Sequence, residues 1–391
     1  MSDDTGGLPL SFKARQGSRR ASSILGIAGQ DLFVSEARQL GHHYKEAVVE
    51  EGASGSAWRT TSDEGSYLGG TDRAPFPLGF FNAGLQSDLA GRVARLVNTR
   101  GVAVSRIAVG VSTQYSLSGS FENGTGQGYA EAVGAHVAFE SPAADGDLVA
   151  LVRSAIAESP AYDLVQRPLE NTFALYCNGR RRDAVSLPAS NAPAPMDPYL
   201  KYAKAPAPVP DIAGLGDLIV KGPKTDAPSA SFSVTPAAGG RVTWAVNGEG
   251  LIEPATGLYR CNVALNRPGS STFSYIADET AGDRAPSGLT LLSAAIAFCY
   301  MTQLSRYIEA MKLAIRNVRL VQLSPYGLDA AGYGRASACD THLFMQGGSD
   351  EAVFERLQLV AANTCYLHQT MVHATPLKVT ASNGENSIIT A

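Results

Sequence analysis

A four-residue motif that occurs twice divides this chain into two similar halves. Asp72-Arg73-Ala74-Pro75 recurs as Asp283-Arg284-Ala285-Pro286, so residue 72 corresponds to residue 283 at an offset of 211. The letters SDEG (62–65) before the first copy are echoed by ADET (277–280) before the second. Three later pairs keep the 211 offset: Leu78 and Leu289, Ala83 and Ala294, Arg95 and Arg306. Duplication explains this constant spacing better than chance does.

Each copy is expected to be an α+β unit. Alternating segments at Arg241–Val246 and Ser271–Ile276 predict strands. An apolar Ala/Leu-rich run follows Pro286 and predicts a long buried helix, because proline is tolerated just before a helix. The remaining predicted elements are strands at 316–327 and 341–348, a helix over 348–365 with Ser349 as its N-cap, and a last strand at 376–384.

A Pro/Ala-rich segment separates the halves. The composition changes at residues 186–238, where proline removes hydrogen-bond donors and favours an extended connector. With 391 residues the chain is long enough for two domains. The predicted division is a first repeat at 12–185, a linker at 186–238 and a second repeat at 239–391.

Composition excludes several classes of protein. A net charge of −4 argues against a nucleic-acid partner. The apolar run of residues 289–301 is shorter than a membrane span, so no membrane partner is expected. The polar start MSDDTGG lacks a secretory pattern, which predicts a cytoplasmic protein.

Two of the five cysteines fall on predicted helices. Cys299 lies within the apolar helix, and Cys365 ends the following one. A thiolate in an apolar pocket, with a second thiol in reach, can attack a peroxide and then form a disulfide. The alternative is that both cysteines only pack in the core, as buried cysteines often do. Cys177, Cys261 and Cys339 are expected to be structural.

The cysteine helices resemble those of the OsmC/Ohr family. The resemblance is carried by APSGLTLLSAAIAFCYMTQL (285–304), by NTC (363–365) and by DETAGDRAP (278–286), and SDEGSYLGGTDRAPFPLGFFNAGLQSDL (62–89) carries it in the first half. Members are usually intertwined homodimers with cysteine sites at the interface. The resemblance therefore implies two OsmC-like repeats, each an antiparallel sheet with a long central helix, forming an intramolecular pseudo-dimer.

The two halves differ in their thiols. At the 211 offset Cys299 falls on Asp88, and a second offset of 205, which relates Asn178 to Asn383, places Cys365 opposite Pro160. One active site per chain is therefore expected, in the second half. Asp88 is expected either to pair with an arginine such as Arg92 or to line a remodelled pocket.

The hydroperoxide reductases that this sequence resembles support their thiolate with an arginine and a glutamate. The stretch SGLTLL (287–292) lacks a carboxylate, so Glu279 or Asp278 is a candidate substitute. Arg284 is the nearest cation in the sequence, and it either assists Cys299 or lies at the surface. Weaker candidates are Arg260 and Arg73.

His368 follows Cys365 by three residues, so the two side chains share one face of a helix. It is a candidate base for Cys365 or for a substrate, or only a histidine at a helix end. No metal site and no cofactor are expected, because no second Cys/His pair has suitable spacing. His42 and His43 lie in a polar run and are expected to face solvent.

Three functions remain open at the level of the sequence. The first is a thiol-dependent peroxidase that uses Cys299 and Cys365 on an organic hydroperoxide, with a thiol reductant as partner. The second is a cysteine-dependent hydrolase or lyase that acts on a larger organic substrate between the repeats, with His368 as base. The third is a ligand-binding or scaffold protein without catalysis. A homodimer of the fused chain is a further candidate partner.

Overall fold

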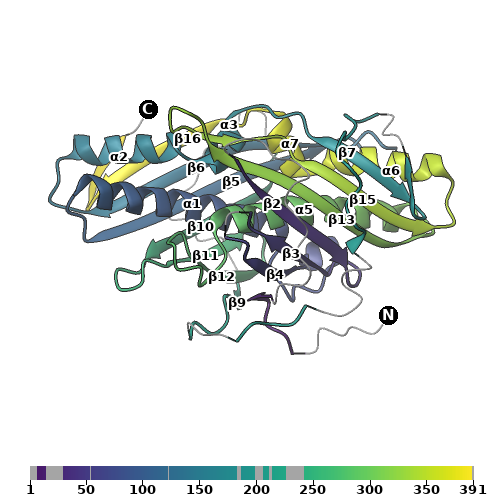
Figure 1. Cartoon of the computed structure of the whole chain (residues 1–391), viewed down its shortest axis with the longest axis horizontal. Coiled ribbons are helices and arrows are strands. Elements are labelled where there is room, and N and C mark those ends of the chain that lie inside the picture. The colour runs from purple at the N-terminus through teal and green to yellow at the C-terminus, as the bar shows by residue number, and fades with distance from the viewer. Residues whose placement is uncertain are drawn as a thin grey trace.

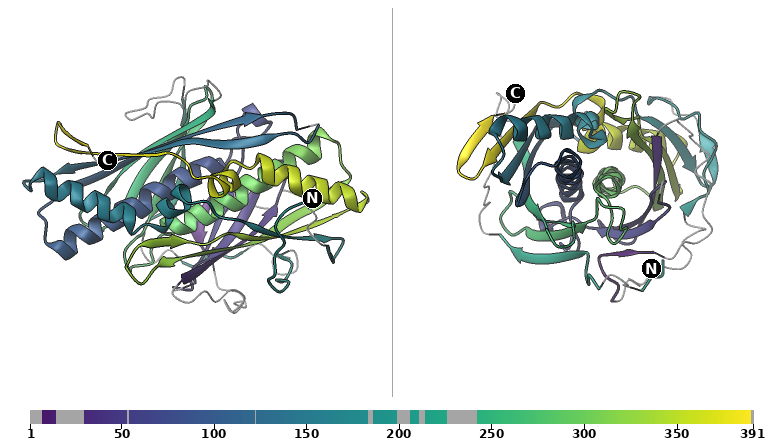
Figure 2. Two further views of the ribbon diagram at one scale, coloured as in Figure 1. Left: turned by 90° about the horizontal axis from the view of Figure 1, so that it is seen from above. Right: turned by 60° about the vertical axis from the view of Figure 1, so that its left-hand side comes forward.

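Two long helices lie side by side at the centre of the molecule, and two sheets surround them (Figures 1 and 2). The computed structural model describes residues 7–14, 30–52, 54–121, 123–182, 186–198, 206–210, 214–225 and 242–389. The helices are α1 (Pro77–Arg100), α2 (Asp145–Ala157), α3 (Pro160–Gln166), α5 (Gly288–Ala310), α6 (Glu351–Thr364) and α7 (Tyr366–Val372), together with the short 3-10 helix η2 (Ser66–Leu68). The mixed α+β fold expected from the sequence is confirmed.

The central pair consists of α1 and α5. Pro77 starts α1, and the Ser287 side chain caps α5 by accepting a hydrogen bond from the Thr290 backbone N–H. By length and composition α5 could cross a membrane, but 94% of its most apolar window is buried inside the protein. In this fold α5 is therefore a core helix.

Glycine allows α1 and α5 to cross closely. A Cβ placed on Gly84 would lie 2.7 Å from the carbonyl oxygen of Gly288, and one on Gly288 would lie 2.6 Å from that of Gly84. Real side chains do not approach so closely, so the crossing needs glycine on both helices.

The first sheet covers one side of the helix pair. Its strands are, in spatial order, β1 (Ser11–Lys13), β4 (Ala57–Ser62), β3 (Lys45–Glu50), β2 (Gln30–Gln39), β13 (Ile315–Leu328), β15 (Asp340–Gly347), β7 (Thr172–Cys177) and β8 (Arg180–Arg182), with β14 (Gly334–Ala336) paired to β13. The second sheet has the order β17 (Asn386–Ile389), β16 (Leu377–Asn383), β6 (Gln127–Glu140), β5 (Arg106–Ser118), β10 (Val242–Ile252), β11 (Tyr259–Leu265), β12 (Ser271–Ala277) and β9 (Ile219–Lys224).

Both sheets combine strands from distant parts of the chain. Strand β2 pairs with β13, for example Ser35 opposite Gln322, and β5 pairs with β10, for example Val111 opposite Gly248. Neither sheet can therefore be completed by one half of the chain alone. This arrangement also brings side chains from the first 70 residues next to α5.

The expectation of antiparallel sheets is wrong at one pair in each sheet. Strands β15 and β7 are parallel, and so are β16 and β6. The members of each pair lie far apart in sequence, so no tight turn constrains them to run in opposite directions.

Other expectations about local structure are mostly confirmed. The predicted strands and helices of the second half match β10, β12, β13, β15, β16, α5 and α6. The N-cap of α6 is Asp350 rather than Ser349, one residue later than expected. Part of the predicted linker forms β9 at a sheet edge, whereas residues 226–241 lie outside the described residues, as do Val185 and Gly239 at the predicted boundaries.

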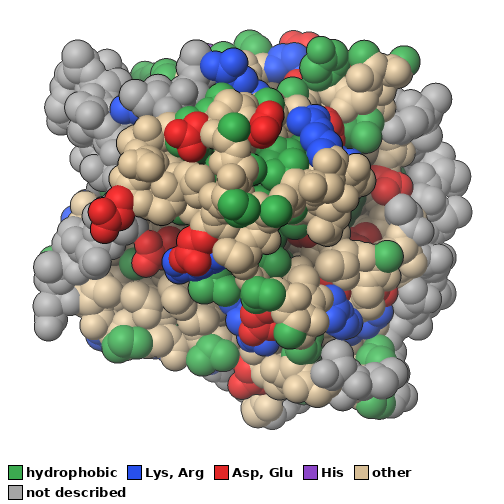
Figure 3. All heavy atoms as spheres, turned by 90° about the vertical axis from the view of Figure 1, so that its left-hand side faces the viewer, with side chains coloured by type: hydrophobic (Ala, Val, Ile, Leu, Met, Phe, Trp, Pro, Cys, Tyr) green, Lys and Arg blue, Asp and Glu red, His purple; other side chains and the backbone are tan. Residues whose placement is uncertain are grey.

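The surface carries charges of both signs. Figure 3 shows one end of the molecule, on which Lys/Arg and Asp/Glu side chains are interspersed. This mixture agrees with the small net charge of the sequence.

Candidate active site around Cys299 and Cys365

The fold brings Cys299 and Cys365 together. Cys299 lies midway along α5, and Cys365 occupies the break between α6 and α7, where it is the N-cap of α7. Burial raises the pKa of the Cys365 thiol well above its usual value, and hydrogen bonding to the neighbouring Cys299 thiol raises it further. The two thiols are therefore neighbours in the core.

His368 contacts Cys365 from one turn further along α7. Its Nδ1 lies 3.2 Å from the Cys365 Sγ, and its ring packs against Tyr300 and Phe173. Burial lowers the pKa of His368 to about 3, so the imidazole is neutral at pH 7. A neutral, enclosed ring can position the thiol, but it is a weak base.

Cys299 lines a small cavity of about 20 Å³. A cavity of this size holds about one water molecule. The wall includes Tyr67 of η2 and Trp244 of β10, whose ring centroids lie 5.2 Å apart. The Trp244 indole N–H donates to the Tyr366 hydroxyl over 2.8 Å, which fixes this wall next to Cys365.

Two buried side chains from the first half, Glu64 and Lys45, bind the Thr302 hydroxyl beside this cavity. The Thr302 hydroxyl, one turn after Cys299 on α5, donates to Glu64 Oε1 over 2.7 Å and accepts from Lys45 Nζ over 2.8 Å. Burial lowers the pKa of Lys45 and raises the pKa of Glu64, while the charge of each partner opposes that effect. The Lys45 ammonium also interacts electrostatically with Cys299.

Arg306 adds a second cation on this face of α5. Its guanidinium donates to Gln303 Oε1 over 2.9 Å and lies 4.2 Å from the centre of the Phe121 ring. Burial lowers the pKa of Arg306, whereas the charges of Tyr366, Glu64 and Cys299 act in the opposite direction. Cys299 therefore interacts electrostatically with two cations, the buried Lys45 and the partly buried Arg306.

The structure places Glu279 and Arg284 in other interactions. Glu279 accepts hydrogen bonds from the Ser87 hydroxyl over 2.8 Å and from the Gly288 backbone over 2.5 Å, at the beginning of α5. Arg284 forms an ion pair with Asp278 over 2.9 Å. Neither residue lines the Cys299 cavity.

The weaker arginine candidates also have other partners. Arg260 pairs with Glu253, and the Arg73 guanidinium lies 4.4 Å from the centre of the Tyr44 ring. In place of these residues the fold uses Glu64, Lys45 and Arg306. One sequence signal points to Glu64: the similarity of SDEG to ADET relates Glu64 to Glu279. In the structure Glu64 contacts Thr302 of α5, whereas Glu279 contacts Ser87 of α1.

In the first half, Asp88 and Ser159 occupy the positions that correspond to the two thiols. Asp88 pairs with Arg92, whose Nη2 lies 2.8 Å from Asp88 Oδ1, so the expected Asp88–Arg92 pair is confirmed. The Ser159 hydroxyl donates to Asp88 and is the N-cap of α3, just as Cys365 is the N-cap of α7. Both helices have seven residues, so the counterpart of Cys365 is Ser159, and the expected match to Pro160 was one residue out.

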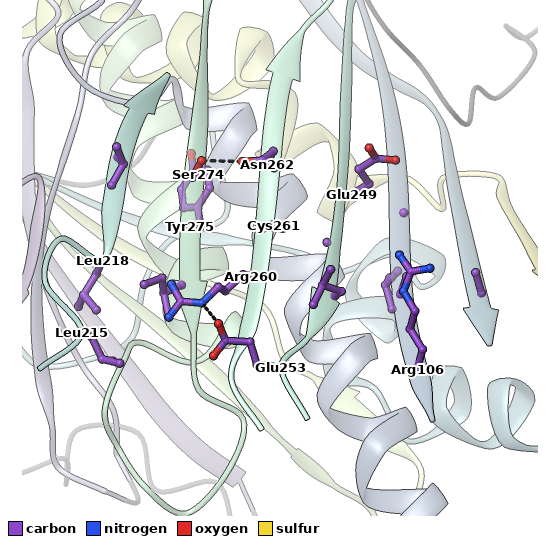
Figure 4. A pocket seen from close by; sticks show the side chains of 18 of the residues that line it. Arg106, Leu215, Leu218, Glu249, Glu253, Arg260, Cys261, Asn262, Ser274 and Tyr275 are labelled. Atoms are coloured by element: carbon purple, nitrogen blue, oxygen red, sulfur yellow. Dashed lines mark hydrogen bonds and ion pairs between the residues drawn. The ribbon is translucent and has the colours of Figure 1, made fainter. Parts of the chain in front are cut away.

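The larger cavities lie elsewhere. One of about 980 Å³ is formed on the face of the second sheet that points away from α1, between Arg106 and Leu218 (Figure 4). There Arg260 pairs with Glu253, and Ser274 donates to Asn262. Cys261 alternates with Arg260 and Asn262 along β11 and packs in the core, where burial raises the pKa of its thiol. The cavity shares no lining residue with that of Cys299.

Comparison with known protein families identifies the segment that contains both thiols. The family model described as OsmC, OsmC-like protein, matches residues 281–380, from the motif before α5 into β16. Residues 281–380 therefore resemble an OsmC-like domain. The resemblance inferred from the cysteine helices is confirmed, and Cys299, Cys365 and His368 all lie within the OsmC-like segment.

One solved structure adds a distant similarity. An OsmC-like hydroperoxide resistance protein from Jannaschia sp. CCS1 is 18% identical, with 38% of this chain and 97% of that chain covered and a TM-score of 0.26. No curated protein matches the sequence. The function is therefore argued below from the OsmC-like match and from the site itself.

Proposed function

We propose that this protein is a thiol-dependent peroxidase that reduces organic hydroperoxides through Cys299 and Cys365. The Cys299 thiolate attacks the outer peroxide oxygen, the O–O bond breaks, and the alkoxide takes a proton to leave as an alcohol. Cys299 is then a sulfenic acid. The Cys365 thiol displaces water from it to form a disulfide, and an external thiol reductant returns both cysteines to thiols.

The proximity of the Cys299 and Cys365 thiols, which affects the pKa of Cys365, is the observation that carries this proposal. Disulfide formation needs sulfur atoms in mutual reach. Both residues lie in the matched OsmC-like segment, and OsmC-like proteins include one described as a hydroperoxide resistance protein. A reducing compartment such as the cytoplasm would supply the thiol reductant.

The surroundings of the two thiols support their different roles. Cys299 lines the cavity, and Lys45 and Arg306 both interact electrostatically with it. Cys365 is not part of the cavity wall, and its raised pKa keeps it a thiol until Cys299 has been oxidised. These differences support Cys299 as the nucleophile and Cys365 as the resolving residue.

Substrate access requires the cavity to open. A volume of about 20 Å³ is too small for an organic hydroperoxide, so the wall of Tyr67 and Trp244 must separate during binding. The wall side chains Leu68, Phe76, Leu78 and Leu265 are apolar and suit an organic group next to the peroxide.

The same proposal treats the chain as two fused OsmC-like repeats, at 12–185 and 239–391, that take the place of a homodimer. Each sheet uses strands of both halves, and Glu64 and Glu279 reach the central helix of the opposite half. Under this interpretation the Asp88–Ser159 pair marks the position from which a second thiol site was lost.

The hydrolase or lyase alternative has less support from the site. His368 has a pKa of about 3, and the raised pKa of Cys365 opposes thiolate formation there. The large cavity of the second sheet brings neither His368 nor the two thiols to its surface.

The test is hydroperoxide consumption by the full chain with dithiothreitol as reductant and cumene hydroperoxide as substrate. We expect Cys299→Ser to abolish turnover and Cys365→Ser to permit one oxidation per chain without sustained turnover. Cys261→Ser, a buried cysteine outside the cavity, is the matched control and should remain active. Full activity in Cys299→Ser would refute the proposal.

A further inference from the structure

A group of three side chains at one end of α5 has no part in the thiol chemistry. His42 and His43 form the turn between β2 and β3, and Glu309 is the penultimate residue of α5. One potential ligand atom from each residue lies within 4.8 Å of the others. The expectation that both histidines face solvent is wrong for His43, whose side chain is completely buried, whereas His42 is half exposed.

Buried His43 lacks an adequate polar partner. Neither of its ring nitrogens makes a well-formed hydrogen bond within the described structure, and the backbone group that acts on the ring is that of Leu68. Its Nε2 points to Glu309, with 4.0 Å between Nε2 and Oε2. Buried polar groups in native proteins are nearly always satisfied, so this nitrogen needs an explanation.

The side chains of His42 and Glu309 have the spacing that a shared metal ion requires. His42 Nε2 lies 3.4 Å from Glu309 Oε2. Two ligands each about 2.1 Å from a tetrahedral zinc ion lie about 3.4 Å apart. The 4.0 Å from His43 Nε2 to the same oxygen exceeds this by a few tenths of an ångström, which a rotation of the exposed Glu309 side chain can remove.

The turn is held in place next to α5. Gln39 donates to the His42 carbonyl over 2.6 Å and to the Ser305 hydroxyl over 3.2 Å, and Lys45 donates to the His43 carbonyl over 3.0 Å. These bonds fix the backbone of both histidines and thereby limit the entropy lost when a metal binds.

We propose that His42, His43 and Glu309 bind a divalent transition metal ion of the zinc type, with the remaining coordination position open to water. Two imidazoles and one carboxylate are a ligand set that zinc accepts with water in fourth place. Glu309 is the single carboxylate of the set, so hard cations that need several carboxylates are disfavoured. The positive charges of Lys45 and Arg306 near His43 act against cations of every kind and do not select among them.

The ion would link the β2–β3 turn to the end of α5. Sequence spacing could not reveal this site, because Glu309 is far along the chain from the histidine pair. The inference does not depend on the peroxidase proposal, since Cys299 and Cys365 are not ligands.

The test is titration of the full chain with Co²⁺, followed by visible absorption, and then displacement with Zn²⁺. We expect one Co²⁺ per chain, absorption typical of nitrogen and oxygen ligands without a thiolate charge-transfer band, and the same result in a Cys299→Ser/Cys365→Ser variant. His42→Ala and Glu309→Gln alter exposed side chains and should each weaken binding at least about tenfold. His43→Ala should do the same if it folds.

His373→Ala, which removes another exposed histidine, is the matched control and should leave affinity unchanged. The proposal is overturned if Co²⁺ does not bind, if His42→Ala and Glu309→Gln bind it like the unaltered chain, or if replacement of the two cysteines abolishes binding.

Discussion

At the scale of single residues, the side chains that support Cys299 come from distant strands. The two cysteines could be predicted from their positions on apolar helices, and Asp88–Arg92 could be predicted because it is a local contact of one helix turn. Glu64 and Lys45 could not be assigned, because their contact with Thr302 depends on how β3 and β4 pack on α5. Sequence distance favours Glu279 instead, because it is nearer to Cys299 along the chain.

The Lys45 charge is predicted to accelerate oxidation of Cys299. Lys45→Met should slow the first step with cumene hydroperoxide about tenfold or more, because it removes a buried cation near the thiolate. Stopped-flow measurement of thiol oxidation tests this. Lys13→Met is the matched control, because Lys13 pairs with Asp283 outside the cavity.

A stability measurement shows whether Lys45→Met reacts slowly because the charge is lost or because the variant is less well folded. Lys45→Met leaves Glu64 buried without this cation, which costs about 3–5 kcal/mol in comparable cases. The double variant Lys45→Met/Glu64→Gln should regain much of that stability and still react slowly. An unchanged oxidation rate in this folded double variant would exclude a role for the charge.

Glu279 is predicted to make the protein less stable as the pH rises. Burial, followed by the nearby Asp88 charge, raises the pKa of Glu279 from 4.5 to about 7, whereas Arg92, Ser87 and the Gly288 N–H oppose the shift. The folded state thus holds a proton that the unfolded state loses first. The stabilisation of the fold by protonated Glu279 is complete below about pH 4.5 and is lost between about pH 4.5 and 7. The free energy of unfolding falls by at most about 3 kcal/mol over this range.

Chemical denaturation across this pH range tests the Glu279 prediction. Glu279→Gln should flatten the dependence between pH 4.5 and 7 and be relatively more stable at pH 8. Glu140→Gln, at an exposed ion pair with Arg106, is the control. An equal slope in Glu279→Gln and the unaltered chain would contradict the assignment.

At the scale of elements, the helix crossing determines the geometry of the centre. Hydrophobic pattern and the proline before each helix are sufficient to predict α1 and α5, because these signals are local. The close contact of Gly84 with Gly288 could not be predicted, since the sequence does not specify which faces meet. The parallel pairs β15–β7 and β16–β6 escaped prediction for the same reason.

Gly84→Ala is expected to destabilise the protein. The added methyl group would lie 2.7 Å from the Gly288 carbonyl oxygen, and such overpacking costs about 1–3 kcal/mol. Gly146→Ala is the matched control in helix α2, where a Cβ meets nothing within 4 Å, and it should stabilise the fold by up to about 1 kcal/mol. Equal unfolding midpoints for the two variants would refute this account of the crossing.

At the scale of the whole molecule, the sheets join the two halves more closely than a linker would. The repeated motif predicts two similar units, but it cannot show that β2 pairs with β13 and β5 with β10. Both pairings are long-range, and each leaves a hydrophobic sheet edge when one partner is removed.

Separate expression of residues 1–185 and 186–391 tests this arrangement. We expect each piece alone to lack cooperative thermal unfolding, and the two pieces expressed together to form a folded one-to-one complex. Size-exclusion chromatography and circular dichroism would measure this. Cooperative unfolding of either piece by itself would show that the exchanged strands are not required.

The most direct test of the central claim is the disulfide formed after one equivalent of cumene hydroperoxide, mapped by mass spectrometry of the non-reduced full chain. We predict one Cys299–Cys365 disulfide and three free thiols at Cys177, Cys261 and Cys339. Five free thiols after the peroxide has been added, or oxidation confined to the other three cysteines, would contradict the account.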